Sequence, residues 1–551
     1  MKLYKISLFM LSAALLSTAC NDIDEQVPEG GTLTREQNQE TVAAIPERAD
    51  ASFNGMFSMM GRPHACWPTG NNSNRADDFG FISSALSQDL EGADICLPNS
   101  NYNWFSTCSE MSSRNANYAN PYMRYCIPYN QIGMANEVIG TYPEDTTDSL
   151  AVNRIAQARA IRAFDYMALA PYFAFGIDRA ADEPCVPILR EGTDYSNNPR
   201  ASVKEVWEYI IEDLNYAVDH LEFGVRTSKD RIDKNVALAL RARANLNLGK
   251  YAEAAADADA ALTGYTPATI AEVSKPAFCS LEEHNWIWGI NITTELANID
   301  SSPTCSSWLG SFTGDGYGPY INPPFINVLL YNKISDTDVR KGWWLDEEAK
   351  SPNLEGLTWT DPKTGATATG NEIPGFEIED VKIAYNPYTN VKFGQKTGIG
   401  STVNANDFPL IRAEEMFLIK AEGLLKSGKE AEAKTVLENF VKTYRDPSYT
   451  ASQRNLNLAD EIWFQRRVEL WGEGFFTWDA KRLNKNIVRF HGKGTSNFPD
   501  AFQFNVAADD PWLNMRFPNT ELDNNYGVVD NYGGEIPVAE QNPNLLDGVT
   551  D

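Results

Sequence analysis

The feature that most constrains this chain is the segment from Glu461 to Leu483, EIWFQRRVELWGEGFFTWDAKRL. Its apolar residues recur at intervals of four, three and four, which is the spacing of one face of an α-helix. Charged residues crowd the same turns, and two glycines then break the helix before a second aromatic cluster. The segment therefore predicts a buried helix with its own ion pairs. The stripe is Phe464, Val468, Trp471 and Phe475, and the charges are Arg466, Arg467, Glu469 and Glu473.

This segment resembles the signature helix of the SusD/RagB family, whose members are nutrient-binding lipoproteins of the Bacteroidetes outer membrane. The shared pattern is RR-x-EL-x-x-EG-x-x-x-x-D-x-KR. The chain departs from the family at Gln465, where Glu is usual, and at Phe476, where Arg is usual. These departures put one ion pair of the family's usual network in question. The resemblance identifies the fold rather than the binding site.

Two further stretches resemble the same family. One is YNQIGMANEVI at residues 129–139, and the other is the ending from Ile536 to Asn544. With the N-terminal lipoprotein signal described next, the resemblance runs from Cys20 almost to the last residue.

The N-terminus is typical of an exported lipoprotein. Lys2 and Lys5 precede a short apolar run, and small residues then lead directly into Cys20, as in a bacterial lipobox. We expect residues 1–19 to be a signal peptide and Cys20 to carry the lipid. Acidic residues behind Cys20 resemble the surface-export signal of Bacteroidetes lipoproteins, so we expect an outer-membrane anchor with the protein facing the exterior. Residues 20–40 are polar and read as a flexible tether.

The charge balance limits the possible partners. The 551 residues hold 47 Lys and Arg against 75 Asp and Glu, a net charge of −28. Phosphate backbones would be repelled, so nucleic acid is excluded as a natural partner. After the signal peptide, no apolar run is long enough to span a membrane.

Signals for metal, cofactor or catalytic chemistry are weak. The histidines His64, His220, His284 and His491 share no ligand spacing, and no cysteine pair has CxxC spacing. We therefore expect no metal, no cofactor and no enzyme activity. Cysteines other than Cys20 read as buried small residues with one or two disulfides possible, and the sequence leaves their pairing open. They are Cys66, Cys96, Cys108, Cys126, Cys185, Cys279 and Cys305.

Two segments share the frame of a helical hairpin, namely residues 236–262 and 413–441. In each, a small residue, Ala242 or Ala421, stands seven positions before a glycine that ends the first helix. Both resemble tetratricopeptide helix pairs. Their glycines are 428 − 249 = 179 residues apart, so the hairpins are not tandem repeats.

The fold prediction is mainly α: a tetratricopeptide-like helical-hairpin scaffold with a large, irregular, loop-rich lobe. Further helices are expected at residues 129–139, 156–173 and 203–221, and a strand is expected at residues 285–292. Residues 61–120 read as a first loop region. The expected SusD-like domain is 41–551, divided into a scaffold (41–275 and 410–490), the lobe (276–409) and a tail (491–551).

Aromatic residues inside polar loops are the candidate ligand contacts, because flat rings stack on the C–H faces of sugars while Asn, Asp and Arg bind hydroxyls. The family resemblance implies binding aromatics in two such loop regions, by region rather than by position. In the first region Phe105 also reads as exposed. The nominated ligand-binding residues are Trp67, Arg75, Asn101, Tyr102, Trp104, Trp308, Asp315, Tyr317 and Tyr320.

The resemblance implies a surface protein that captures oligosaccharides and delivers them to a SusC-like TonB-dependent transporter. A RagB-like peptide-binding protein is the alternative, and a surface glycoside hydrolase is less favoured. A hydrolase needs two carboxylates across a cleft. A peptide site would favour polar backbone contacts over stacking rings.

Overall fold

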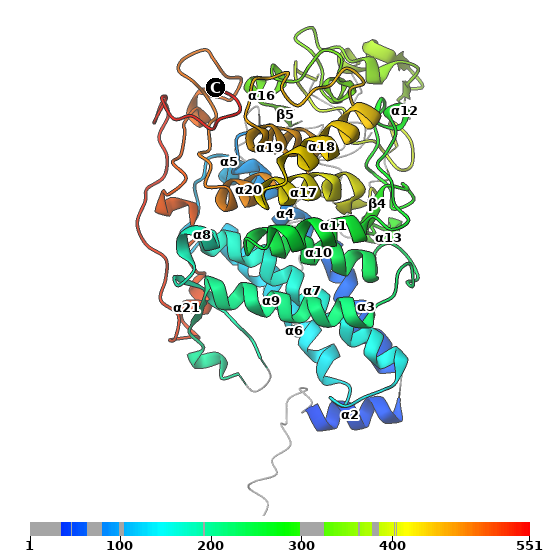
Figure 1. The fold of residues 1–551 in the computed structure, drawn as a ribbon, viewed down its shortest axis with the longest axis vertical. Helices are drawn as coiled ribbons and strands as arrows, with labels where there is room; N and C mark the ends of the chain where they lie inside the picture. The colour runs from blue at the N-terminus through cyan, green and yellow to red at the C-terminus, as the bar shows by residue number, and fades with distance from the viewer. Residues whose placement is uncertain are drawn as a thin grey trace, which may run out of the picture.

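The fold comes from a computed structural model in which most of the chain after residue 34 is described. Figure 1 shows a stack of helices with irregular segments around it. The side chains of Arg35, Glu36 and Trp104 are not described. The described residues are 35–45, 47–62, 80–97, 104–190, 193–297, 324–361, 364–376, 385–401, 403 and 405–551.

A layer of long helices forms the scaffold, and each helix packs against the next in chain order. The two predicted hairpins are present, and α11 of the first packs directly on α17 of the second, although residues 262–412 separate them. The mainly helical fold prediction is therefore confirmed. The layer consists of α6 (Ala119–Gly140), α7 (Ser149–Phe173), α9 (Val203–His220), α10 (Lys234–Asn247), α11 (Tyr251–Ala261), α17 (Ala413–Lys426) and α18 (Glu430–Tyr444).

Glycines make both hairpins possible. Gly249 and Gly428 have φ of +69° and +84°, a left-handed conformation that favours glycine at a helix end. The N–H of Lys250 donates to the Asn245 carbonyl at 2.9 Å, which closes the first helix. Gly423 serves the stack itself, because a Cβ there would lie 2.6 Å from the Tyr251 carbonyl oxygen.

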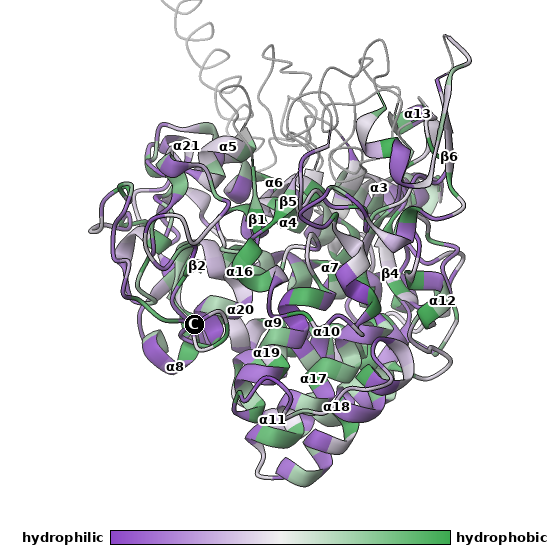
Figure 2. Ribbon diagram, turned by 90° about the horizontal axis from the view of Figure 1, so that it is seen from above, coloured by the Kyte–Doolittle hydropathy of each residue, from purple (hydrophilic) through white to green (hydrophobic). Residues whose placement is uncertain are grey.

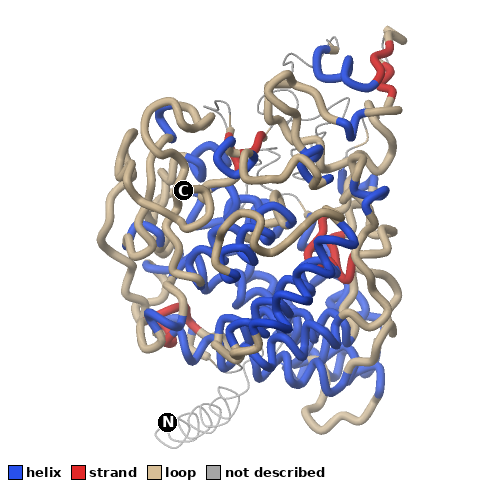
Figure 3. The backbone as a smooth tube through the Cα atoms, turned by 45° about the horizontal axis from the view of Figure 1, so that its top comes forward, coloured by secondary structure: helices blue, strands red, loops and turns tan. Residues whose placement is uncertain are grey.

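The strands in the described residues form short two-stranded ribbons rather than a continuous sheet, as the red segments in Figure 3 show. The expected strand at residues 285–292 is confirmed, and it pairs antiparallel with the segment that leads into α17. The pairs are β1 (Ile95–Cys96) with β5 (Phe325–Ile326), β2 (Pro184–Pro187) with β3 (Arg200–Ser202), β4 (Trp286–Ile290) with β8 (Phe408–Arg412), and β6 (Thr358–Thr360) with β7 (Thr367–Thr369).

The first loop region is partly helical, which corrects the loop interpretation of residues 61–120. α4 (Gly80–Leu90) is buried on every face. Its serines Ser83, Ser84 and Ser87 lie in the interior, so the segment lacks the one-sided apolar pattern that reveals a surface helix. α5 (Trp104–Ser109) follows.

The N-terminal boundary also differs from the prediction. α2 (Arg35–Ala44) begins inside the range expected to be tether. Its polar side chains bind the end of α6, where Asn38 Nδ2 donates to Thr141 Oγ1 at 3.0 Å. These contacts hold a helix that lacks an apolar stripe. α3 (Glu47–Ser58) follows and packs on α6.

The signature segment forms α19 (Leu458–Glu469) and α20 (Phe476–Arg482), separated at the two glycines as predicted. No helix in the described ranges is long and apolar enough to cross a membrane. Within the described ranges, the remaining short α-helices are α8 (Ile177–Ala180), α12 (Ile270–Val273), α13 (Thr294–Ala297), α16 (Val328–Tyr331) and α21 (Asn519–Leu522).

Candidate functional site

The nominated residues lie almost entirely outside the described ranges. Trp104 begins α5, but its side chain is not described. Its neighbour Phe105 is buried, so the expectation of an exposed ring there is wrong. The nominated residues outside the described ranges are Cys20, Trp67, Arg75, Asn101, Tyr102, Trp308, Asp315, Tyr317 and Tyr320.

The bases of the two candidate loop regions share one anchor, the β1–β5 ribbon. β1 precedes residues 98–103, and β5 follows residues 298–323. The strands run antiparallel with Cys96 opposite Phe325, so both loop segments join the ribbon at the same end. Figure 2 shows α5 and α13, which also border these segments, on the side opposite α11 and α18. The fold thus brings the bases of the two regions together.

The base of residues 63–79 is fixed against β4. A Cβ on Gly61 would lie 2.5 Å from Ile292 Cδ1 and 2.9 Å from Ile290 Cγ2, so a larger residue there would have to displace both isoleucine side chains. Gly80 has φ of +51°, and a Cβ there would collide with the Met60 carbonyl oxygen. The two ends of this loop segment therefore start side by side.

Arg489 fastens the elements that carry the first loop region. Its buried guanidinium donates to the carbonyls of Gly92 at 2.8 Å, Ser109 at 2.5 Å and Glu91 at 3.1 Å. These carbonyls follow α4 and end α5. Burial lowers the pKa of Arg489 to about 9. Sequence reasoning missed this residue, because its partners lie about 380–400 positions away in the chain.

The signature helix reaches the same ribbon through Arg467. Its guanidinium pairs with Asp94 at 2.6 Å, directly before β1, and with Asp547 of the tail at 2.6 Å. Burial raises the pKa of Asp94 even though Arg467 opposes the shift. Trp471 Nε1 also donates to the Asp94 carbonyl at 3.0 Å. The family-specific helix thus positions the strand that carries a candidate loop.

Glu469 is the centre of a fully buried charge network. Its carboxylate accepts hydrogen bonds from Arg445 at 2.8 Å, Arg412 at 3.2 Å and Arg340 at 3.2 Å. Burial alone would raise the pKa of Glu469, but the three cations, Arg445 foremost, hold it below its ordinary value. The network is closed to solvent, which confirms that this segment builds the core.

The two departures from the family pattern are accommodated in the core. Gln465 Oε1 accepts from Arg340 Nη2 at 2.6 Å, and its Nε2 donates to Glu461 Oε1 at 2.9 Å. An amide therefore satisfies a cation and a carboxylate at once. The Phe476 ring packs near Trp463 and lies 5.2 Å beneath the Arg467 guanidinium.

A buried carboxylate joins α4 to α20. Asp89 accepts backbone N–H groups of Gly474 at 2.9 Å, Phe475 at 2.8 Å and Phe476 at 2.9 Å. Burial raises the pKa of Asp89 to about 7 against the effect of these three hydrogen bonds.

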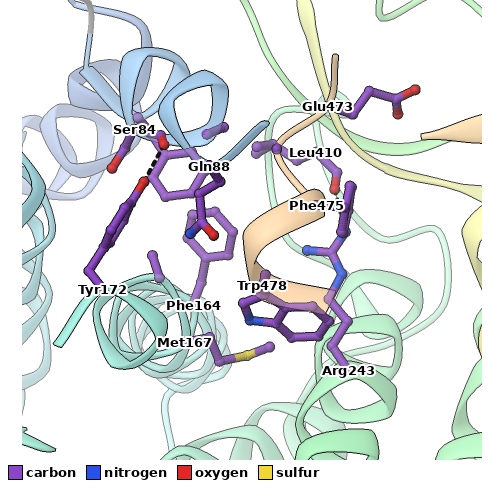
Figure 4. Close-up of a pocket in the computed structure, with 14 residues that line it drawn as sticks. Ser84, Gln88, Phe164, Met167, Tyr172, Arg243, Leu410, Glu473, Phe475 and Trp478 are labelled. Carbon is purple, nitrogen blue, oxygen red and sulfur yellow. Dashed lines mark hydrogen bonds between the residues drawn. The ribbon is translucent and has the colours of Figure 1, made fainter. Parts of the chain in front are cut away.

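A small cavity lies beside this junction, between α4, α7, α10 and α20 (Figure 4). Its lining includes the apolar side chains of Phe164, Met167 and Trp478 and the polar side chains of Gln88 and Arg243. Its volume of about 60 Å³ has room for water but is far below the size of a sugar-binding pocket. The cavity is therefore a packing gap in the core.

The described part of the chain contains no group of side chains arranged to bind a metal ion. No cluster of His, Cys, Asp or Glu among these residues could hold a metal ion. His284 instead pairs with Glu272 at 3.1 Å, and His491 lies against the Thr550 carbonyl at 3.2 Å. The free thiols in these ranges are Cys96, Cys108, Cys126, Cys185 and Cys279.

The architecture defines a class of protein: a scaffold of stacked helical hairpins in which a charged core helix anchors the ribbon at the base of two loop regions. Residues 378–534 match the family model for the SusD family. The curated "SusD-like protein P38" of Formosa agariphila is 23% identical over 414 residues, covering 66% of this chain and 73% of that protein.

Solved structures match nearly the whole chain. A SusD-like carbohydrate binding protein from Bacteroides vulgatus has a TM-score of 0.67 at 23% identity, covering 87% of this chain and 96% of its own. A SusD superfamily protein from Bacteroides thetaiotaomicron has a TM-score of 0.67 at 20% identity, with coverages of 88% and 99%. Surface glycan-binding protein A from Bacteroides uniformis has a TM-score of 0.58 at 18% identity, with coverages of 88% and 99%. Residues 378–534 therefore belong to the SusD family by sequence, and the chain as a whole shares the fold of the SusD-like structures.

Proposed function

We propose that this protein is a cell-surface glycan-binding lipoprotein that delivers oligosaccharides to a SusC-like TonB-dependent transporter in the outer membrane. The observation that carries the proposal is the β1–β5 ribbon, which joins the bases of two aromatic-rich loop regions. The carbohydrate-binding relatives named above support a glycan as the ligand. The protein binds without catalysis, needs no cofactor, and is divided into tether, scaffold, lobe and tail as predicted, except that the tether ends before α2.

A glycan and peptide array on residues 35–551, which keep α2 whole, tests the ligand class. We expect neutral or acidic oligosaccharides to bind and peptides not to bind. Selective peptide binding would replace the proposal with a RagB-like function, and turnover of a bound glycan would replace it with a hydrolase.

The loop aromatics are tested by Trp308→Ala and Trp104→Ala. Stacking of nucleic-acid bases on aromatic rings is worth about 1–3 kcal/mol, and on this analogy each change weakens glycan affinity about 5- to 150-fold without unfolding. Trp463→Ala is the matched control, because Trp463 is buried in the core. It should lower the melting temperature and leave the affinity of each folded molecule unchanged. The same behaviour in Trp308→Ala would exclude Trp308 from the site.

The lipid anchor and the partner need separate tests. Cys20→Ser should abolish lipid labelling and release the protein from the outer-membrane fraction. At native expression in mild detergent, the wild type should co-purify with a large β-barrel transporter in near-stoichiometric amount. Retention of Cys20→Ser in the membrane would refute the anchor, and purification of the wild type alone would refute the delivery model.

A further inference from the structure

The three most exposed aromatic side chains in the described residues are tyrosines on the C-terminal tail or beside it. Tyr532 is 86% exposed, Tyr526 is 74% exposed and Tyr195 is 63% exposed. A tyrosine ring offers an apolar face together with a polar tip. Grouped large apolar groups on a surface mark binding sites more often than single ones do.

Hydrogen bonds hold Tyr526 in place from both ends. Its backbone N–H donates to the Ser196 carbonyl at 3.0 Å, and its hydroxyl lies 3.1 Å from Ser196 Oγ. Ser196 Oγ in turn donates to Asp194 Oδ1 at 2.7 Å. Tyr195 precedes Ser196, so the two exposed tyrosines lie on adjoining segments. A ring fixed before binding loses little conformational entropy when a ligand covers it.

Hydrogen bonds tie the tail to the segment around Tyr195. Asn525 is buried and links them twice, since Asn198 N–H donates to Asn525 Oδ1 at 2.9 Å and Asn525 Nδ2 donates to the Asn198 carbonyl at 2.8 Å. Gly527 packs so closely that a Cβ would lie 2.9 Å from Pro199 N. The fold therefore fixes the backbone segments that carry both rings.

A polar hollow of about 590 Å³ lies along the same segment. Arg190, Asn198 and Glu212 are among its lining residues. Arg200 also lines it and donates through Nη1 to the Val529 carbonyl at 3.1 Å, so the tail borders the hollow. Its volume is in the range of small-ligand sites, about 300–1,000 Å³.

We propose that Tyr195, Tyr526 and this hollow form a second glycan-binding site, which takes a segment of a neutral polysaccharide. The rings stack on the C–H faces of sugars, and the hollow's Arg, Asn and Glu side chains bind the hydroxyls. Glutamates along α9 line the hollow and disfavour an acidic glycan. A protein partner would instead favour an apolar centre depleted of charge.

This inference rests on the proposed function and adds a second contact on the same chain. Two sites on one protein raise the effective concentration of a long ligand at each site. Long chains should therefore be held more tightly than short oligosaccharides, which reach only one site.

The test uses affinity electrophoresis of the full chain in gels containing amylopectin, xylan, mannan or laminarin. In Tyr195→Ala/Tyr526→Ala, we expect retention by the bound polysaccharide to weaken about 5- to 150-fold, with binding of its short oligosaccharides unchanged. Phe223→Ala is the matched control, because Phe223 is an exposed ring (44%) on the loop before α10. Its retention should equal that of the wild type.

The outcomes separate the two proposals. Unchanged retention of the double variant, with Trp308→Ala weakened, would overturn the second site and leave the proposed function standing. If none of the four polysaccharides retained the wild-type protein, both the proposed function and the second site would be wrong for neutral glycans. If the double variant lost its co-purifying transporter but kept its retention, the tyrosines would be a protein contact and the second site would be wrong.

Discussion

The buried network around α19 and the tyrosine surface at the tail use aromatic and charged residues in opposite ways. Around Glu469 every neighbouring cation is buried and paired. At Tyr526 the ring is exposed and only its ends are bonded. The network contains much of the signature pattern, and replacing one of its members would leave a buried charge without its partner. Residues at an exposed surface can vary with the ligand. The signature segment lies in the core, so it does not reveal which ligand the protein binds.

Burial explains this contrast energetically. Removing one member of a buried ion pair leaves a charge without solvent or partner and costs about 3–5 kcal/mol. Surface substitutions away from such features usually stay within about 0.5 kcal/mol. Core variants should therefore change stability, whereas surface variants should change binding.

The largest effect is expected for Glu469→Ala, which leaves Arg340, Arg412 and Arg445 facing one another without their shared carboxylate. We expect a loss of about 3–5 kcal/mol, or about 3–5 °C in melting temperature for a chain of this length. Differential scanning calorimetry measures it. Glu348→Ala, which breaks an exposed pair with Lys350, should leave the melting temperature unchanged. Equal shifts in melting temperature for Glu469→Ala and Glu348→Ala would contradict the difference expected between buried and exposed ion pairs.

A smaller effect is expected for Gln465→Glu, which restores the residue usual in the family. The new carboxylate would keep Arg340 but lose the donor to Glu461 and place two buried carboxylates together. We expect about 1–3 kcal/mol of destabilisation, measured by urea unfolding. Gln465→Met, which lacks both polar atoms, separates charge repulsion from the loss of hydrogen bonds. If Gln465→Glu were more stable than the wild type, the expected repulsion between the two carboxylates would be wrong.

A pH dependence follows from Asp89, whose folded pKa of about 7 exceeds its ordinary value of 3.8. Between these values the folded state binds a proton that the unfolded state does not, so stability is highest at low pH and falls as pH rises toward 7. From pH 5.5 to 7.5 this carboxyl alone should cost about 2 kcal/mol. Asp89→Asn should remove that part of the slope in urea unfolding at both pH values. Parallel slopes for the two proteins would contradict the assignment.

Local patterns in the sequence predicted the elements that have one apolar face. The apolar stripe of Val206, Ile210 and Leu214 predicts α9. Gly249 and Gly428 predict the two hairpin turns. α4 escaped prediction because it is buried on every face and contains interior serines. The stacking of α11 on α17 could not be predicted, since the intervening chain hides their adjacency.

The candidate site could be predicted only by region. The sequence nominated two loop regions, but their common anchor depends on the pairing of Cys96 with Phe325, which are 229 positions apart (325 − 96). Arg489 donates to backbone carbonyls. Every residue has a backbone carbonyl, so the sequence does not show which ones Arg489 contacts. The tail tyrosines stand among Asn and Gly like the nominated aromatics, yet the fold alone shows that Phe105 is buried and Tyr526 exposed.

The smallest change in stability is expected for Tyr526→Phe, which separates the contribution of the ring from that of the hydroxyl. The variant keeps the ring and removes only the hydroxyl next to Ser196 Oγ. Its melting temperature should stay within about 1 °C of the wild type, as for other surface changes. Polysaccharide retention should fall much less than in Tyr526→Ala, because stacking depends on the ring. If retention fell equally in both variants, the hydroxyl rather than the ring face would be the binding group, and the tail would act by hydrogen bonding like the hollow beside it.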